Sequence, residues 1–108
     1  MTVRAAERRR SVRFAAAYPV TIHDRRGRFL TRCRTANTSE NGVFLLVNNF
    51  RGLPTKGEVL LEITVPSQVG RHDRRPVSRV VVYEARIVRA DPMGHLVGMG
   101  LEFLRKLR

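Results

Sequence analysis

The chain has 108 residues and a mass of 12.3 kDa, which is the size of one domain and too small for two. Its 21 Lys and Arg against 9 Asp and Glu give a formal charge of +12, while a hydrophobic content of 43% suffices for one core and excludes a disordered basic tail. No apolar run reaches the roughly 18 residues that cross a bilayer, and no secretory signal is visible. Cys33 is the one cysteine, so an internal disulfide framework is excluded. We therefore expect a cytoplasmic protein without membrane insertion whose partner is anionic.

The positive charge is concentrated near the N-terminus. Residues 1–34 carry ten arginines against Glu7 and Asp24, a balance of +8, whereas residues 35–70 have a balance of −1 and residues 71–108 of +5. Arginine presents its donors as a flat fork, which suits phosphate groups and the edges of bases better than lysine does. The N-terminal third is therefore the first place to search for an anion-binding group.

A β pattern dominates the chain, and six short strands are predicted. In chain order they span residues 18–22, 28–36, 42–47, 58–65, 77–90 and 95–103. The alternation of apolar and polar residues is strictest in 58–65, and Pro66 is expected to end that strand. Six short strands joined by Gly, Pro and Asn turns predict an all-β antiparallel barrel or sandwich, since closing the sheet removes its exposed edges.

The connections between these strands are predicted from their turn residues. Asp24-Arg25-Arg26-Gly27 predicts a hairpin in which Gly27 supplies a positive φ. Asp91-Pro92-Met93-Gly94 predicts the turn before the last strand, where His95 and Phe103 are expected to share the apolar face. Residues 66–76 are predicted to form a loop, and helix has little support apart from a single turn in 103–108.

Two further assignments follow from composition and alternation. Cys33 shares a strand face with Phe29 and is predicted to be an inert core residue. Residues 1–13 are predicted to be a flexible arginine-rich arm, and residues 14–108 the barrel domain.

The first candidate binding motif is Arg8-Arg9-Arg10-Ser11-Val12-Arg13, directly before the first predicted strand. Arg9 and Arg13 are four positions apart, which places both on one side of an extended or a helical segment. Their guanidinium groups can bridge phosphate oxygens or bind the O6/N7 edge of guanine. Taken alone, the motif also fits a solvated tail or an arm that binds nucleic acid without specificity.

The second candidate is Asn37-Thr38-Ser39-Glu40-Asn41-Gly42, between the second and third predicted strands. Asn37 offers a donor and an acceptor, and Ser39 offers a hydroxyl on the same side of an extended segment. Gly42 permits a positive φ or the close approach of a ligand. Taken alone, the motif also fits a polar turn whose side chains bond their own backbone.

Together the two motifs resemble those of the PilZ domain family. The pattern begins with two adjacent arginines and a third arginine four positions after the second. Two strands follow, and then the motif Asn-x-Ser-x-x-Gly. The matching residues are Arg8, Arg9, Arg13, Asn37, Ser39 and Gly42. The closing stretch Gly98-Met99-Gly100-Leu101-Glu102-Phe103 is also similar to the last strand of that family, and the resemblance extends from about Glu7 to Phe103.

The resemblance implies a six-stranded antiparallel β-barrel of the split-barrel type that binds the second messenger cyclic di-GMP. It implies that Arg9 and Arg13 clamp the ligand from the arm and that Asn37 and Ser39 bond it from the barrel, while Gly42 shapes the turn. Arg8 is similar to family members that hold two stacked ligand molecules, and Arg10 is either a further contact or solvated. Binding would order the arm and thereby affect a downstream protein.

One departure from the family concerns the C-terminus. Many members continue into a helix that packs on the barrel, whereas this chain ends at Arg108, soon after the last predicted strand. We therefore expect little or no C-terminal helix.

Other functions are less well supported by the sequence. A basic barrel that binds nucleic acid nonspecifically remains an alternative, although the lack of Trp and an aromatic content of 6% leave few stacking platforms. A PilZ-like adaptor without a ligand is a second alternative, which the intact arginine motif disfavours. The three histidines lack the spacing of metal ligands, and Ser39 lacks the context of a nucleophile, so we expect neither a metal, a cofactor nor an enzyme.

Overall fold

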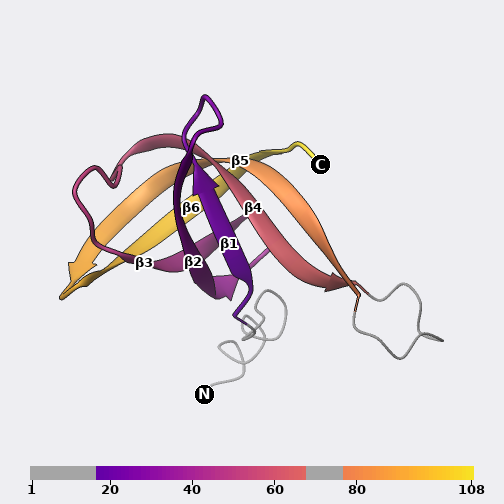
Figure 1. The fold of residues 1–108 in the computed structure, drawn as a ribbon, viewed down its shortest axis with the longest axis horizontal. Helices are drawn as coiled ribbons and strands as arrows, with labels where there is room; N and C mark the ends of the chain where they lie inside the picture. The colour runs from indigo at the N-terminus through magenta and orange to yellow at the C-terminus, as the bar shows by residue number, and fades with distance from the viewer. Residues whose placement is uncertain (1–16, 68–76) are drawn as a thin grey trace, which may run out of the picture.

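Six antiparallel strands close into a barrel in the computed structural model, which describes residues 17–67 and 77–108 (Figure 1). The strands are β1 (Pro19–His23), β2 (Phe29–Thr38), β3 (Gly42–Asn48), β4 (Gly57–Ser67), β5 (Val77–Met93) and β6 (Leu96–Lys106). Around the barrel they follow the order β1-β2-β3-β6-β5-β4, and β4 pairs with β1 to close it. The predicted fold is confirmed, while the predicted arm at residues 1–13 lies outside the described residues.

The interior is filled by the aliphatic residues that alternate along five of the strands. The buried cluster consists of Val20, Ile22, Val43, Leu45, Val47, Val59, Leu61, Ile63, Ala85, Ile87, Val97, Met99 and Leu101. Strand β2 differs, because its one buried residue in the described part is Thr35, while Leu30 and Cys33 are half-buried against the cluster. Cys33 was predicted to be a core residue, and it packs against the core at its edge.

The hairpin between β1 and β2 has the predicted turn. The Asp24 carboxylate accepts hydrogen bonds from the backbone N–H groups of Arg26 and Arg28, both at 2.9 Å. The bond from the backbone of Arg28 is the main reason that the pKa of Asp24 lies below its ordinary value. Gly27 has a φ of 88°, which an L-residue rarely adopts.

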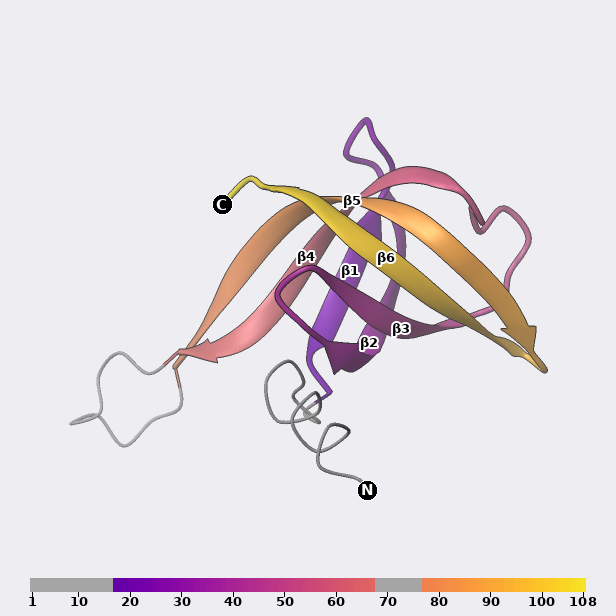
Figure 2. The same ribbon diagram turned by 180° about the vertical axis from the view of Figure 1, so that it is seen from behind.

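Strands β4 and β5 are longer than predicted, because proline does not end either of them. Pro66 pairs with Ser78, and Pro92 pairs with Val97, so the second turn contracts to Gly94 and His95. Both prolines lie where their strand has a partner on one side in the described structure, in the two-stranded extensions seen at opposite ends of β5 in Figure 2. A proline is tolerated at such an edge because no neighbour requires its missing N–H.

Three smaller expectations are corrected. Residues 103–108 do not add a helical turn, because β6 continues to Lys106 beside β5. His95 lies exposed in the turn rather than on the apolar face of the strand. Phe29 is 56% exposed, because the β1–β2 register skips Leu30 and turns the Phe29 side chain to the outer face.

The burial of Cys33 leads to a prediction about its reactivity. Burial raises the pKa of the Cys33 thiol from 9.0 to about 12, so the native thiol stays protonated where an unfolded one ionises. Because the thiolate is the nucleophile, we expect labelling by a disulfide reagent at pH 8 to be about 100-fold slower in the native protein than in denaturant. The free energy of unfolding should also fall as pH rises between these two pKa values. Equal labelling rates would contradict this prediction.

Candidate functional site

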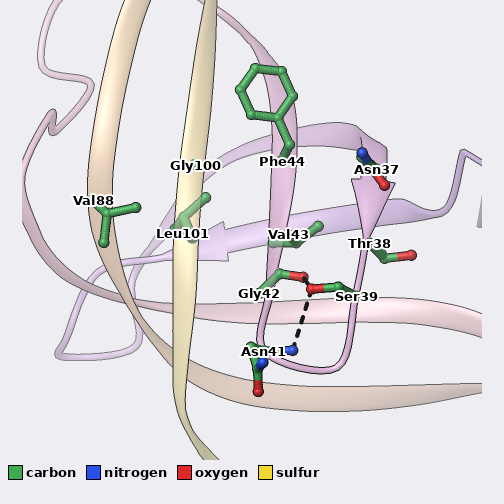
Figure 3. Close-up of a pocket in the computed structure, with 10 residues that line it drawn as sticks. All are labelled: Asn37, Thr38, Ser39, Asn41, Gly42, Val43, Phe44, Val88, Gly100 and Leu101. Carbon is green, nitrogen blue, oxygen red and sulfur yellow. Dashed lines mark hydrogen bonds between the residues drawn. The ribbon is translucent and has the colours of Figure 1, made fainter. Parts of the chain in front are cut away.

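An open pocket of about 380 Å³ lies on the outer side of the barrel, beside the turn between β2 and β3. It is lined by Asn37, Thr38, Ser39, Asn41, Gly42, Val43, Phe44, Val88, Gly100 and Leu101 (Figure 3). All three residues of the predicted second motif therefore lie in one pocket. The described residues add an apolar wall, formed by Phe44, Val88 and Gly100, that the motif itself does not indicate.

Asn37 reaches this outer surface because of a β-bulge. Thr35 pairs with Leu45 in the interior, and the next pair is Asn37 with Phe44, so Ala36 is the extra residue. Strict alternation would place Asn37 on the buried face with Thr35, and the bulge reverses the phase. The Asn37 carboxamide makes no hydrogen bond within the described residues and stands beside Phe44 at the edge of the pocket (Figure 3). No described residue therefore competes with a ligand for this carboxamide.

Ser39 is in part bonded to its own turn, which is the alternative that the sequence left open for this motif. Its hydroxyl donates to the Gly42 carbonyl at 3.4 Å and accepts from the Asn41 N–H at 3.3 Å, while its backbone N–H donates to the Gly42 carbonyl at 3.0 Å. The two hydroxyl bonds are long and therefore weak. The backbone bond holds the turn, and the hydroxyl can exchange its partners for a ligand.

Of the two roles expected for Gly42, the positive φ is not observed. A Cβ on Gly42 would instead lie 2.3 Å from the carbonyl oxygen of Leu101 in β6, so any side chain there would force the two strands to shift. The glycine thus allows β3 to approach β6 closely at the edge of the pocket, and it shapes the site through strand packing.

The apolar wall is built on glycines of β6. Gly100 pairs with Phe44 on one side and lies below Val88 on the other, since a Cβ at Gly100 would meet Val88 Cγ2 at 3.7 Å. The Phe44 ring lies over Gly98, where an added Cβ would be 2.7 Å from its Cζ. The result is a flat apolar surface of the kind on which a planar ring can lie.

The point where the described chain begins is bonded to β2 close to the pocket. The Tyr18 N–H donates to Thr35 Oγ1 and the Thr35 N–H donates to the Tyr18 carbonyl, both at 2.9 Å. The Arg34 guanidinium also donates to the Ala17 carbonyl at 3.0 Å. Because β1 and β2 are antiparallel with Pro19 opposite Arg34, this end of β1 lies toward Asn37.

The residues that line the pocket carry no charge. Nearby on β5, Arg86 is ion-paired with Glu102 and Arg89 with Asp91. The predicted ligand residues Arg8, Arg9 and Arg13 lie outside the described residues, and the structure does not place them relative to Asn37 and Ser39. Within the described ranges, no cluster of three His, Cys, Asp or Glu residues could hold a metal ion. The same ranges contain no helix long and apolar enough to cross a membrane.

Comparison with known families agrees with the fold. The family model described as "PilZ domain" matches residues 7–108. This chain belongs to the PilZ domain family. PilZ domains are non-catalytic binding modules, and the family typically binds cyclic di-GMP. The matched residues include both the arginine motif and the Asn-x-Ser-x-x-Gly motif.

Among solved structures, the chain is similar to the Bacillus subtilis inhibitor of motility (MotI/DgrA), with a TM-score of 0.67 and 22% sequence identity. The likeness covers 93% of this chain and 44% of that one, so this chain spans less than half of the other protein. At this identity the likeness supports the barrel fold. No curated protein matches the sequence.

The tight approach at Gly42 gives a prediction about stability. We expect Gly42→Ala to lower the free energy of unfolding by about 1–3 kcal/mol, because the new methyl group overlaps the Leu101 carbonyl. Gly100→Ala is the matched control, since its methyl group would meet Val88 at an ordinary 3.7 Å. Urea unfolding of both variants provides the measurement. Equal stability of the two would show that the approach of β3 to β6 does not require a glycine.

Proposed function

We propose that this PilZ domain is a cyclic di-GMP receptor that binds its ligand in the pocket lined by Asn37, Ser39 and Gly42, with Arg9 and Arg13 closing over it. The observation that carries the proposal is the anchoring of Ala17 and Tyr18 to Arg34 and Thr35.

That anchor limits how far the arginine motif can be from the pocket. Arg13 precedes Ala17 by four residues, so its Cα lies within about 14 Å of the Ala17 Cα whatever path the chain takes. Asn37 follows Thr35 in β2, about 7 Å farther along an extended strand. A long arginine side chain can cover the remaining distance. The covalent structure therefore allows the contacts that the motif implies.

The chemistry of the pocket and that of the arginine motif are complementary. The pocket itself is uncharged, so it offers the apolar wall to a purine face and the Asn37 carboxamide and Ser39 hydroxyl to a base edge or phosphate. The two phosphates of cyclic di-GMP need cations, which Arg9 and Arg13 would supply as bidentate donors. Mutual repulsion of the arginines is relieved when the phosphates are bound, which would couple binding to ordering of the arm and to contact with a downstream protein.

Arg8 is relevant to how many ligand molecules the site binds. A third guanidinium beside Arg9 gives enough positive charge for a second dinucleotide stacked on the first. We propose that two stacked molecules occupy the site, and calorimetry measures this directly as the molar ratio.

We expect Arg9→Ala and Arg13→Ala each to weaken cyclic di-GMP binding by at least about 2 kcal/mol, because each removes a charge-assisted bond to the ligand. Asn37→Ala and Ser39→Ala should weaken it less, since they remove neutral bonds. Isothermal titration calorimetry of the full chain measures these effects, with GTP as the control ligand.

The matched control is Arg51→Ala. Arg51 is exposed in the loop that follows β3, at the opposite end of that strand from Gly42, so its removal changes the net charge equally without reaching the pocket. Wild-type affinity in both Arg9→Ala and Arg13→Ala would refute the proposal. Steeply salt-dependent binding of DNA or RNA without any preference for cyclic di-GMP would instead favour a nucleic-acid-binding barrel.

A further inference from the structure

A second β-bulge lies at the wall of the pocket, on β5. Ile87 pairs with Leu101 in the interior, and the next pair is Arg89 with Gly100, so Val88 is the extra residue. Strict alternation would place Arg89 on the same buried face as Ile87, and the bulge turns it outward beside Val88. Val88 lines the pocket over Gly100, and Arg89 follows it on β5 as the strand partner of Gly100.

The Arg89 guanidinium forms an exposed ion pair with Asp91, which a ligand could replace. Its Nε lies 3.3 Å from Asp91 Oδ2, and the two side chains are 64% and 60% exposed. An ion pair this exposed contributes little free energy, because water solvates both charges and screens their attraction. Arg89 is thus an exposed cation that directly follows Val88 of the pocket wall on β5, and it is available to another acceptor.

We propose that Arg89 binds the O6/N7 edge of a guanine that lies against Val88, Gly100 and Phe44, and that Asp91 competes with the ligand for it. This inference rests on the proposed function. A purine seated flat on the apolar wall turns its edges outward, and Arg89 is the strand neighbour of both Val88 and Gly100 in that wall. The O6 and N7 atoms of guanine are two adjacent acceptors, which the forked guanidinium matches. Arg89 is then a specificity-determining residue for the guanine base.

Two variants of opposite expected effect test the proposal by calorimetry on the full chain. Arg89→Gln should weaken cyclic di-GMP binding about tenfold, as loss of a bidentate contact to guanine does. Asp91→Asn should strengthen binding by about two- to fivefold, because it removes a weak competing ion pair. In the Arg89→Gln background, Asp91→Asn should have no effect, since its influence acts through Arg89.

A ligand analogue distinguishes the base contact from a phosphate contact. The 7-deaza analogue of cyclic di-GMP lacks the N7 acceptor, so it should bind the wild-type protein several-fold more weakly than cyclic di-GMP does. It should bind the Arg89→Gln variant as well as cyclic di-GMP does. If the substitution weakened both ligands by the same factor, Arg89 would contact phosphate and the guanine assignment would be wrong.

Arg105→Gln is the matched control. Arg105 is also ion-paired, with its Nε 3.4 Å from Glu84 Oε1, and it is 68% exposed on β6. The variant loses the same charge outside the pocket and should bind cyclic di-GMP like the wild type. Equal affinities of Arg89→Gln and Arg105→Gln for cyclic di-GMP would overturn the Arg89 proposal while leaving the receptor function intact. Failure of the wild-type protein to bind cyclic di-GMP would overturn both.

Discussion

The pair of hydrogen bonds between Tyr18 and Thr35 is the constraint on which the site depends. Thr35 is a hydroxyl side chain in an apolar interior, 3% exposed, and its oxygen accepts the Tyr18 N–H there. A buried polar group without a partner would be costly, so this bond is strongly favoured. It fixes the start of β1 against β2, on the side of β2 that leads to the Asn-x-Ser-x-x-Gly turn.

A second constraint is the phase of the strands, which is reset at four register shifts in the described part of the chain, three of which turn a side chain outward. Alternation alone would direct Phe29, Asn37 and Arg89 into the barrel, and one extra residue turns each of them outward. An aliphatic core has no partner for a carboxamide or a guanidinium, so the registers at Asn37 and Arg89 avoid a large desolvation cost. The same displacement that protects the core supplies the outer surface with its polar and charged groups.

The strands and the two motifs were predictable from sequence because alternation, turn residues and motif spacing are local patterns. The ends of β4 and β5 were not, since the effect of Pro66 and Pro92 depends on whether a neighbouring strand needs their N–H. The role of Gly42 depends on Leu101, which is far away in the chain. The apolar wall could not be predicted either, because Phe44, Val88 and Gly100 come together only through the pairing of β3, β5 and β6.

The order of strands around the barrel has a consequence for folding. The pocket joins the turn that follows β2 to β6, the last strand of the chain, through the β3–β6 pairing. Such a surface does not exist until segments distant in sequence have closed the sheet, so a partly folded chain has no complete pocket to offer. Any ligand held there would bind the native state alone and shift the folding equilibrium of the whole barrel by mass action, rather than stabilising one hairpin. Occupancy of the pocket would therefore raise the free energy of unfolding of the entire domain.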